Sequence, residues 1–189
     1  MPRLFTALEL PAAVKAELHA LHMELPGARW LAPDDYHLTL RFAGDISNGI
    51  AREFATNLAS IDCDAFEIRI SALGAFGGHD PRIVWAGIEP QPKLDALARA
   101  HDKAARQAGL GSEKHPFKPH VTLARLRNSN ADAVARYLTR YGGYRSEPIF
   151  VSGFVLMSSR PMTGGGPYGV VEHFPLHGGY TMEDTDANW

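Results

Sequence analysis

HLTL at residues 37–40 and HVTL at residues 120–123 are two copies of one pattern, His-x-Thr-Leu, separated by 83 positions. The chain contains nine His residues, and the other seven have no Thr two positions later. For this composition, chance gives on the order of 0.04 matches to the four-residue pattern. The repeat therefore indicates a fold that brings the two copies together.

Both copies are predicted to lie on β-strands, over residues 36–43 and 117–126. Because side chains alternate along a strand, the His and Thr of each copy share one face and the two apolar residues share the other. Each copy thus anchors itself in the core and presents an imidazole beside a hydroxyl. The same alternation places Arg41 on the His37 face, whereas Arg125 reaches the His120 face only if the strand ends, twists or bulges after Thr122.

The rest of the chain predicts an α+β fold, because helices and strands are interspersed and short turns join several strands. Apolar residues at Val14, Leu18, Leu21 and Leu25, for example, predict a helix that ends at Pro26-Gly27. Each half of the chain offers a helix, a motif strand and another helix in similar order. The simplest arrangement is bilobal, with two antiparallel β-sheets related by a pseudo-twofold, helices on the outer faces and a central cleft.

We assign residues 1–177 to this single bilobal domain and residues 178–189 to a solvated C-terminal tail. With 189 residues, 45% of them hydrophobic and 21% charged, the chain is long enough to bury a substantial core. Cys63 is the single cysteine and cannot form an internal disulfide, which suits a cytoplasmic protein. Neither a secretory signal nor a long apolar run is evident, so we expect no membrane contact, and we expect a monomer.

The charge balance restricts the nature of a ligand. A net charge of −2 argues against a protein that coats duplex nucleic acid through a broad basic face. A phosphate ligand would instead be held by a few placed cations, for which Arg41 and Arg125 are alternative main contacts. Trp30 and Phe76 could stack on a base, although Trp30 equally suits a core position and Phe76 suits loop packing.

The residues that the two motifs would bring together suit hydrolysis of a phosphodiester. One His, as a neutral base, can deprotonate the attacking water, while the other, protonated, gives a proton to the leaving oxygen. Thr39, Thr122 and an Arg would hold the nonbridging phosphate oxygens as negative charge develops on them. This chemistry requires neither a metal nor a cofactor, and the two imidazoles should titrate as a coupled pair.

Several stretches resemble the two-histidine (2H) phosphoesterase superfamily, and specifically the RNA 2',3'-cyclic phosphodiesterases, also called 2'-5' RNA ligases. The resemblance covers nearly the whole chain. It is carried by residues 3–8, Arg29-Trp30, residues 37–44, 82–85 and 117–125, and the passage from Met157 to Tyr168.

The resemblance implies a bilobal antiparallel fold and metal-independent opening of a 2',3'-cyclic phosphate on RNA or a nucleoside to a 2'-phosphate end. It implies that His120 activates water and that His37 protonates the 3'-oxygen. Arg125 and Phe42, each five residues past a motif His, are implied to lie near the ligand. Reversible 2'-5' ligation of RNA is a further implied activity.

Two other functions compete with this one. A nucleotide-binding module could keep the same pocket without turnover, although the presence of both His and both Thr favours an enzyme. A metallohydrolase could use His37, His120 and a carboxylate, but no paired acidic motif flanks either site.

Overall fold

The computed structural model describes residues 1–159 and 168–179. The Gly-rich stretch at residues 163–167, whose sequence TGGGP predicts a hairpin loop, lies outside this part, as do all but the first two residues of the predicted tail. Within the described residues, no helix is both long and apolar enough to cross a membrane.

Most strands belong to one eight-stranded sheet in which every named pair of strands is antiparallel. Along the sheet the order is β10 (Tyr168–Pro175), β9 (Gly153–Ser159), β1 (Arg3–Glu9), β3 (His37–Asp45), β7 (His120–Leu126), β6 (Ile83–Ile88) and β5 (Ile70–Phe76), with β2 (Ala28–Trp30) paired to β7. A second, two-stranded sheet pairs β4 (Phe66–Ile68) with β8 (Ile149–Val151). The predicted α+β class is therefore confirmed.

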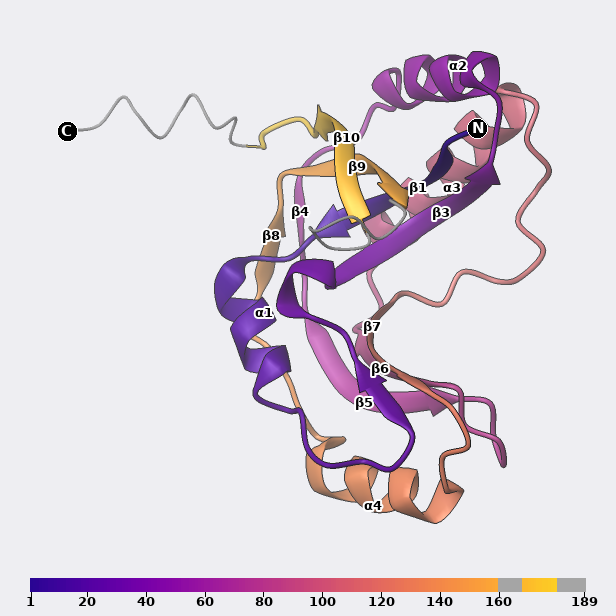
Figure 1. Ribbon diagram of the computed structural model, residues 1–189. Helices are drawn as coiled ribbons and strands as arrows, with labels where there is room; N and C mark the ends of the chain where they lie inside the picture. Colours follow the sequence, from indigo (N-terminus) through magenta and orange to yellow (C-terminus); the bar gives the residue numbers. More distant parts are fainter. Residues whose placement is uncertain (160–167, 180–189) are drawn as a thin grey trace.

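The large sheet has two halves that meet at the motif strands. A single residue pair, Leu38 with Val121, joins β3 to β7. In Figure 1, the half that contains β1 and β3 lies above the half that contains β5, β6 and β7. The structure thus has one sheet with a narrow junction where the sequence predicted two separate sheets.

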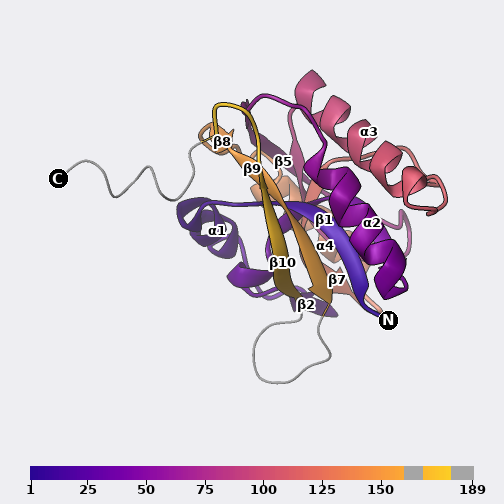
Figure 2. The same ribbon diagram turned by 90° about the horizontal axis from the view of Figure 1, so that it is seen from above.

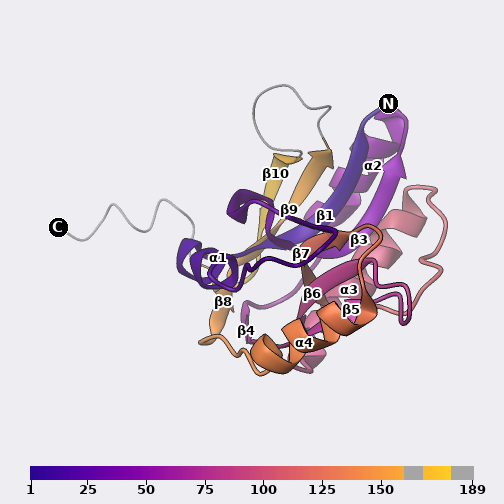
Figure 3. The ribbon, with the colours of Figure 1, turned by 60° about the horizontal axis from the view of Figure 1, so that its bottom comes forward.

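Helices flank both halves of the sheet. They are α1 (Ala12–His19), α2 (Asn48–Ala59), α3 (Pro92–Gln107) and α4 (Ala131–Tyr141), with a short 3-10 helix η1 (Pro33–Asp35) just before β3. Helix α2 packs on α3, which in turn contacts β3 (Figure 2), and α4 contacts β5 (Figure 3). The helix that was predicted to run to Pro26-Gly27 is shorter in the structure, since α1 ends at His19.

The apolar residues of both motifs lie in the core, as alternation predicts. Leu38, Val121 and Leu123 are 0% exposed, and Leu40 is 5% exposed. Burial of side chains of this size stabilises each motif strand by about 1.5–3 kcal/mol per residue. The His and Thr residues of the motifs therefore lie on strands whose opposite faces are packed in the core.

Alternation breaks at the Leu that ends each motif. In β3, Thr39 pairs with Ala7 and Arg41 with Thr6, so that Leu40 is an extra residue. In β7, a register shift likewise skips Leu123, because Thr122 pairs with Trp85 and Ala124 with Val84. These bulges move the residue two positions beyond each Leu onto the His-Thr face.

Candidate active site

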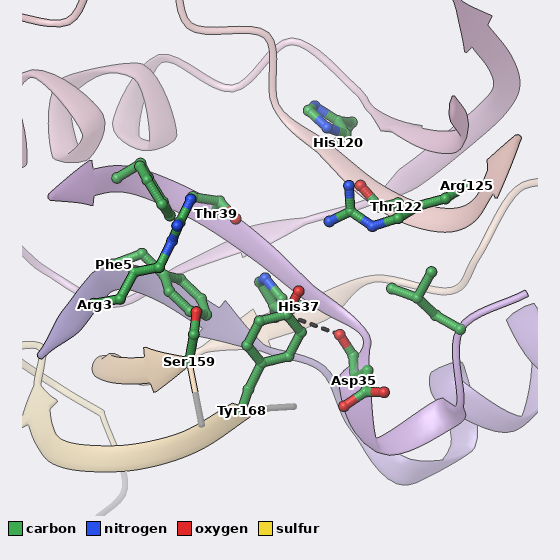
Figure 4. Close-up of a pocket in the computed structure, with 12 residues that line it drawn as sticks. Arg3, Phe5, Asp35, His37, Thr39, His120, Thr122, Arg125, Ser159 and Tyr168 are labelled. Carbon is green, nitrogen blue, oxygen red and sulfur yellow. Dashed lines mark hydrogen bonds between the residues drawn. The ribbon is translucent and has the colours of Figure 1, made fainter. Parts of the chain in front are cut away.

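The two motifs line one pocket with a volume of about 330 Å³, in which their polar side chains face each other (Figure 4). Strand β3 contributes His37 and Thr39 on one side, and β7 contributes His120 and Thr122 on the other. The remaining lining residues are Arg3, Phe5, Leu31, Asp35, Phe42, Arg125, Ser159 and Tyr168. The predicted meeting of the two His-x-Thr copies thus occurs in the structure.

Both imidazoles are oriented by the same backbone contact. Nδ1 of His37 lies 2.8 Å from the carbonyl oxygen of Asp35, and Nδ1 of His120 lies 2.7 Å from that of Lys118. A carbonyl only accepts, so each Nδ1 carries the proton and donates it. In the neutral ring, Nε2 is then unprotonated and can accept a proton, and in the protonated ring it can give that proton up.

His37 is the more enclosed of the two imidazoles. Its ring centroid lies 5.0 Å from the ring of Phe5 and 5.1 Å from that of Tyr168. Burial lowers the pKa of His37 below its ordinary value, and the positive charges of Lys15, Arg125 and His120 lower it further, against the bond to the Asp35 carbonyl. The unliganded site thus favours neutral His37.

Aromatic rings also surround His120. Phe76 meets the His120 ring edge-on at 5.0 Å, and Trp85 lies 6.5 Å away. Phe76 therefore contacts a motif imidazole and supports its orientation, and it is not among the residues that line the pocket.

Arg125 and Phe42 both line the pocket because of the bulges in their strands. The sequence predicts Arg125 on the His120 face only if the strand ends, twists or bulges after Thr122. Strand β7 does bulge there, at Leu123. Phe42 is 42% exposed, and the guanidinium carbon of Arg3 lies 5.2 Å from its ring centroid. One side of the pocket thus offers an accessible aromatic ring and the other a guanidinium.

Arg41 does not share the face of His37, so this prediction from strict alternation is wrong. The bulge at Leu40 turns Arg41 away from the pocket, and its side chain is only 8% exposed. Its Nη1 donates to Glu113 Oε2 at 3.0 Å, its Nη2 donates to the Gly111 carbonyl, and its Nε lies 3.1 Å from Asp102 Oδ1. Arg41 therefore ties β3 to α3 and to the segment that leads to His120.

Trp30 also lies outside the pocket, in the core position that the sequence left open as an alternative. Its ring stacks on His22 at 4.5 Å and approaches Tyr137 at 5.5 Å, while its indole N–H donates to the Met23 carbonyl. With its N–H and much of its ring in use, Trp30 is not placed to stack on a base in the pocket.

Sequence reasoning missed several pocket residues. Arg3 and Phe5 share one face of β1 by alternation, but nothing in the sequence shows that β1 is the neighbour of β3. Tyr168 enters through the β9–β10 pairing, which is likewise non-local. Asp35 carries a detectable signal, because it lies two residues before His37; burial and the charge of Asp34 raise the pKa of its carboxyl.

The described residues form no cluster of metal-ligating side chains. Among residues 1–159 and 168–179, no group of three or more His, Cys, Asp and Glu residues is arranged to hold a metal ion. His19 and His22 lie close together, but the Nε2 of His22 is engaged 2.5 Å from the Tyr36 hydroxyl.

Sequence comparison identifies relatives across most of the chain. A family model described as the 2'-5' RNA ligase superfamily matches residues 10–151. The RNA 2',3'-cyclic phosphodiesterase of Aeropyrum pernix is 37% identical over 131 residues, which cover 67% of this chain and 73% of the relative. That of Aquifex aeolicus is 32% identical over 155 residues, which cover 79% and 82%, respectively.

Structural comparison gives the same result. Escherichia coli LigT, solved in complex with 3'-AMP, is similar with a TM-score of 0.74 and 26% sequence identity. The similarity covers 93% of this chain and 98% of the LigT chain. The likeness therefore extends over both halves of the sheet.

Proposed function

Since the chain belongs to the 2'-5' RNA ligase superfamily, we propose that it hydrolyses 2',3'-cyclic phosphates on RNA ends or nucleosides to 2'-phosphates, without a metal. The observation that carries this proposal is the matched pair of imidazoles, each with Nδ1 fixed by a carbonyl two residues earlier, across one pocket. We further propose that residues 1–177 act as one bilobal domain with a pseudo-twofold between the lobes.

In the proposed reaction, neutral His120 accepts a proton from water at Nε2 while the water oxygen attacks phosphorus. The bond from phosphorus to the 3'-oxygen breaks, and protonated His37 gives its Nε2 proton to that oxygen. The products are a 2'-phosphate and a free 3'-hydroxyl. The assignment of base and acid rests on the family resemblance, and the fixed tautomers of both rings are compatible with it.

Thr39, Thr122 and Arg125 would stabilise the phosphorane-like transition state. Their hydroxyl and guanidinium groups line the same pocket and can donate to the nonbridging oxygens as negative charge grows there. The phosphate would also offset the positive charges that lower the pKa of His37. Substrate binding would therefore favour the protonated form of His37 that the reaction requires.

The same groups would also support ligation. If the 5'-hydroxyl of a second RNA takes the place of water, it gives its proton to His120 and attacks phosphorus of the 2',3'-cyclic phosphate, while the bond to the 3'-oxygen breaks and His37 protonates that oxygen. The product is a 2'-5' linkage, so we include weak ligation in the proposal. A nucleotide complex of the relative LigT supports binding of nucleotide-sized ligands in this fold. We propose that the protein acts as a cytoplasmic monomer.

The decisive experiment incubates the protein with nucleoside 2',3'-cyclic phosphates in excess chelator and identifies the product isomer by chromatography. We expect a 2'-phosphate at an undiminished rate. Loss of turnover on chelation contradicts the metal-independent mechanism, and a 3'-phosphate contradicts the assigned leaving oxygen. Tight binding without turnover would show a nucleotide-binding module instead of an enzyme.

A further inference from the structure

The two motif imidazoles are oriented by backbone carbonyls that are supported in different ways. The Asp35 carbonyl, which accepts from His37, belongs to the hydrogen-bonded turn η1. The next residue, Tyr36, is 1% exposed, and its hydroxyl lies 2.5 Å from the Nε2 of His22. The acceptor for His37 is thus fixed by the local structure around it.

The Lys118 carbonyl, which accepts from His120, has no such turn. Residues 108–119 join α3 to β7 without a helix or strand of their own (Figure 1). Pro116 and Pro119 flank Lys118 and carry no N–H, so the backbone there has few donors with which to form a turn. The place of the His120 acceptor therefore depends on the tertiary contacts of this segment.

Arg41 supplies these contacts from β3. Its Nη2 donates to the Gly111 carbonyl, and its Nη1 donates to Glu113 Oε2 at 3.0 Å. The Glu113 N–H donates at 3.0 Å to Asp102 Oδ1, the same oxygen that lies 3.1 Å from the Nε of Arg41. Within the described part of the chain, every hydrogen bond that joins residues 111–117 to the rest of the molecule ends on Arg41 or Asp102.

These contacts span the narrow junction of the sheet. In the described sheet, the single pair of Leu38 with Val121 joins β3 to β7, so strand pairing does not hold the segment before β7 against β3. Arg41 is 8% exposed, and its ion pairs are therefore screened less by water than surface pairs are. Its planar guanidinium presents the donors in a fixed fork, which constrains direction as well as distance.

We propose that Arg41 is a positioning residue that acts through His120. By holding residues 111–113, Arg41 keeps the Lys118 carbonyl in place as the acceptor for the Nδ1–H of the imidazole. Nε2 of the neutral ring is then unprotonated and can take the proton of the attacking water. If the acceptor moves away, the ring also adopts the tautomer with the proton on Nε2, which cannot act as the base. This inference rests on the proposed function and adds a residue on which its base depends.

The test uses Arg41→Ala, with Arg106→Ala as the matched control. Arg106 pairs with the same carboxylate, that of Asp102, at 3.0 Å, but it is 52% exposed and forms no hydrogen bond or ion pair with residues 111–119. Each change removes one positive charge, so the two variants have the same net charge. Kinetics are measured on a nucleoside 2',3'-cyclic phosphate, well below the unfolding transition of every variant.

We expect Arg41→Ala to lower kcat roughly 10- to 100-fold and to change KM by no more than about twofold, because a small misplacement of a catalytic group affects the chemical step more than binding. Arg106→Ala should keep both constants. Arg41→Lys should recover part of the lost kcat, because Lys keeps the charge and loses the fork of donors.

Two further measurements separate positioning from a loss of folded protein. Because Arg41 acts through His120, Arg41→Ala should have little further effect on kcat in the His120→Ala background. In ¹⁵N NMR, the His120 ring should carry its proton on Nδ1 in wild type and in Arg106→Ala, whereas Arg41→Ala should show a mixture of tautomers.

Glu113→Ala provides a milder variant that also serves if Arg41→Ala does not fold. Its side chain is 42% exposed, and the change removes one of the two anchors of Arg41 on the segment. We expect kcat and the tautomer ratio to shift in the same direction as in Arg41→Ala, by a smaller amount.

An unchanged kcat in Arg41→Ala, or an equal loss in the wild-type and His120→Ala backgrounds, would overturn the inference. A single Nδ1–H tautomer in Arg41→Ala would do the same, as would wild-type values of both readouts in Glu113→Ala. Absence of turnover in the wild type would instead contradict the proposed function. The NMR comparison then still decides whether Arg41 holds the acceptor of His120.

Discussion

Replacing Arg41 and Arg125 separately by Ala should produce opposite phenotypes, although both are the arginines nearest the motifs. Arg41 is buried with two carboxylates and two backbone carbonyls as partners, whereas Arg125 is exposed in the pocket. We expect Arg41→Ala to lower stability and leave phosphate affinity nearly intact. Arg125→Ala should lower phosphate affinity and leave stability nearly intact.

The size of the Arg41 effect follows from its surroundings. Removing one partner of a buried ion pair costs roughly 3–5 kcal/mol. Asp102 and Glu113 retain side-chain exposures of 25% and 42%, so water compensates part of the loss, and about 3 kcal/mol is the reasonable value. At about 2–4 °C per kcal/mol for a chain of this size, Tm should fall by about 6–12 °C.

The Arg125 effect is set by the loss of a charge-assisted contact. Such bonds contribute about 1.5–3 kcal/mol, so a nucleoside 2'-monophosphate should bind at least about tenfold more weakly. Thermal unfolding and calorimetric titration measure the two quantities on the same samples. Arg41→Lys should fall between wild type and Arg41→Ala in Tm, because Lys keeps the charge and loses the fork of donors.

The reverse pattern would refute this reasoning. If Arg41→Ala keeps the wild-type Tm and loses phosphate affinity, while Arg125→Ala binds normally, then the bulges do not place these side chains as described. The assignment of Arg125 to the phosphate would fall with them.

Two further predictions concern histidines. His37→Ala and His120→Ala should each reduce turnover at least about 100-fold, as loss of a general acid or base does, with unchanged Tm. His79→Ala, on an exposed loop, serves as the control. Retention of activity in both motif variants would contradict the mechanism. Burial lowers the pKa of His101 to about 3. Its neutral form therefore stabilises the fold fully above pH 6.5, and this contribution declines by roughly 1.4 kcal/mol per pH unit as pH falls toward 3. Denaturant unfolding at pH 7 and pH 5 should show a smaller difference for His101→Leu than for wild type; equal differences would contradict the assignment.

The motif strands were predictable because their information is local. The spacing of the apolar motif residues predicts a buried strand face, formed by Leu38, Leu40, Val121 and Leu123. Strand geometry then places the His and Thr residues of each motif on the opposite face. The bulge in β7 also has a local trace, since Leu123 and Ala124 are consecutive small or apolar residues within a strand. Alternation alone, applied without that trace, points Arg125 the wrong way.

The bulge in β3 has no such trace. The residue that it buries is Arg41, whose charge is balanced by Asp102 and Glu113, far along the chain. A local pattern cannot reveal partners that only the tertiary fold supplies. The early end of α1 has a similar cause: His22, beyond the helix, packs on Trp30 and contacts the Tyr36 hydroxyl, and such tertiary contacts override helix spacing.

The paired bulges give the site a polarity. Two identical His-x-Thr strands facing each other would accept a cyclic phosphate in either of two orientations, and either ester oxygen could then leave. The second position after each bulged Leu breaks this equivalence, since it holds an aromatic ring, Phe42, in one strand and a guanidinium, Arg125, in the other. In the proposed reaction, a substrate with a flat base at one end and an anion at the other would therefore bind in a single direction. Exchanging these two residues should then scramble which bond is cut.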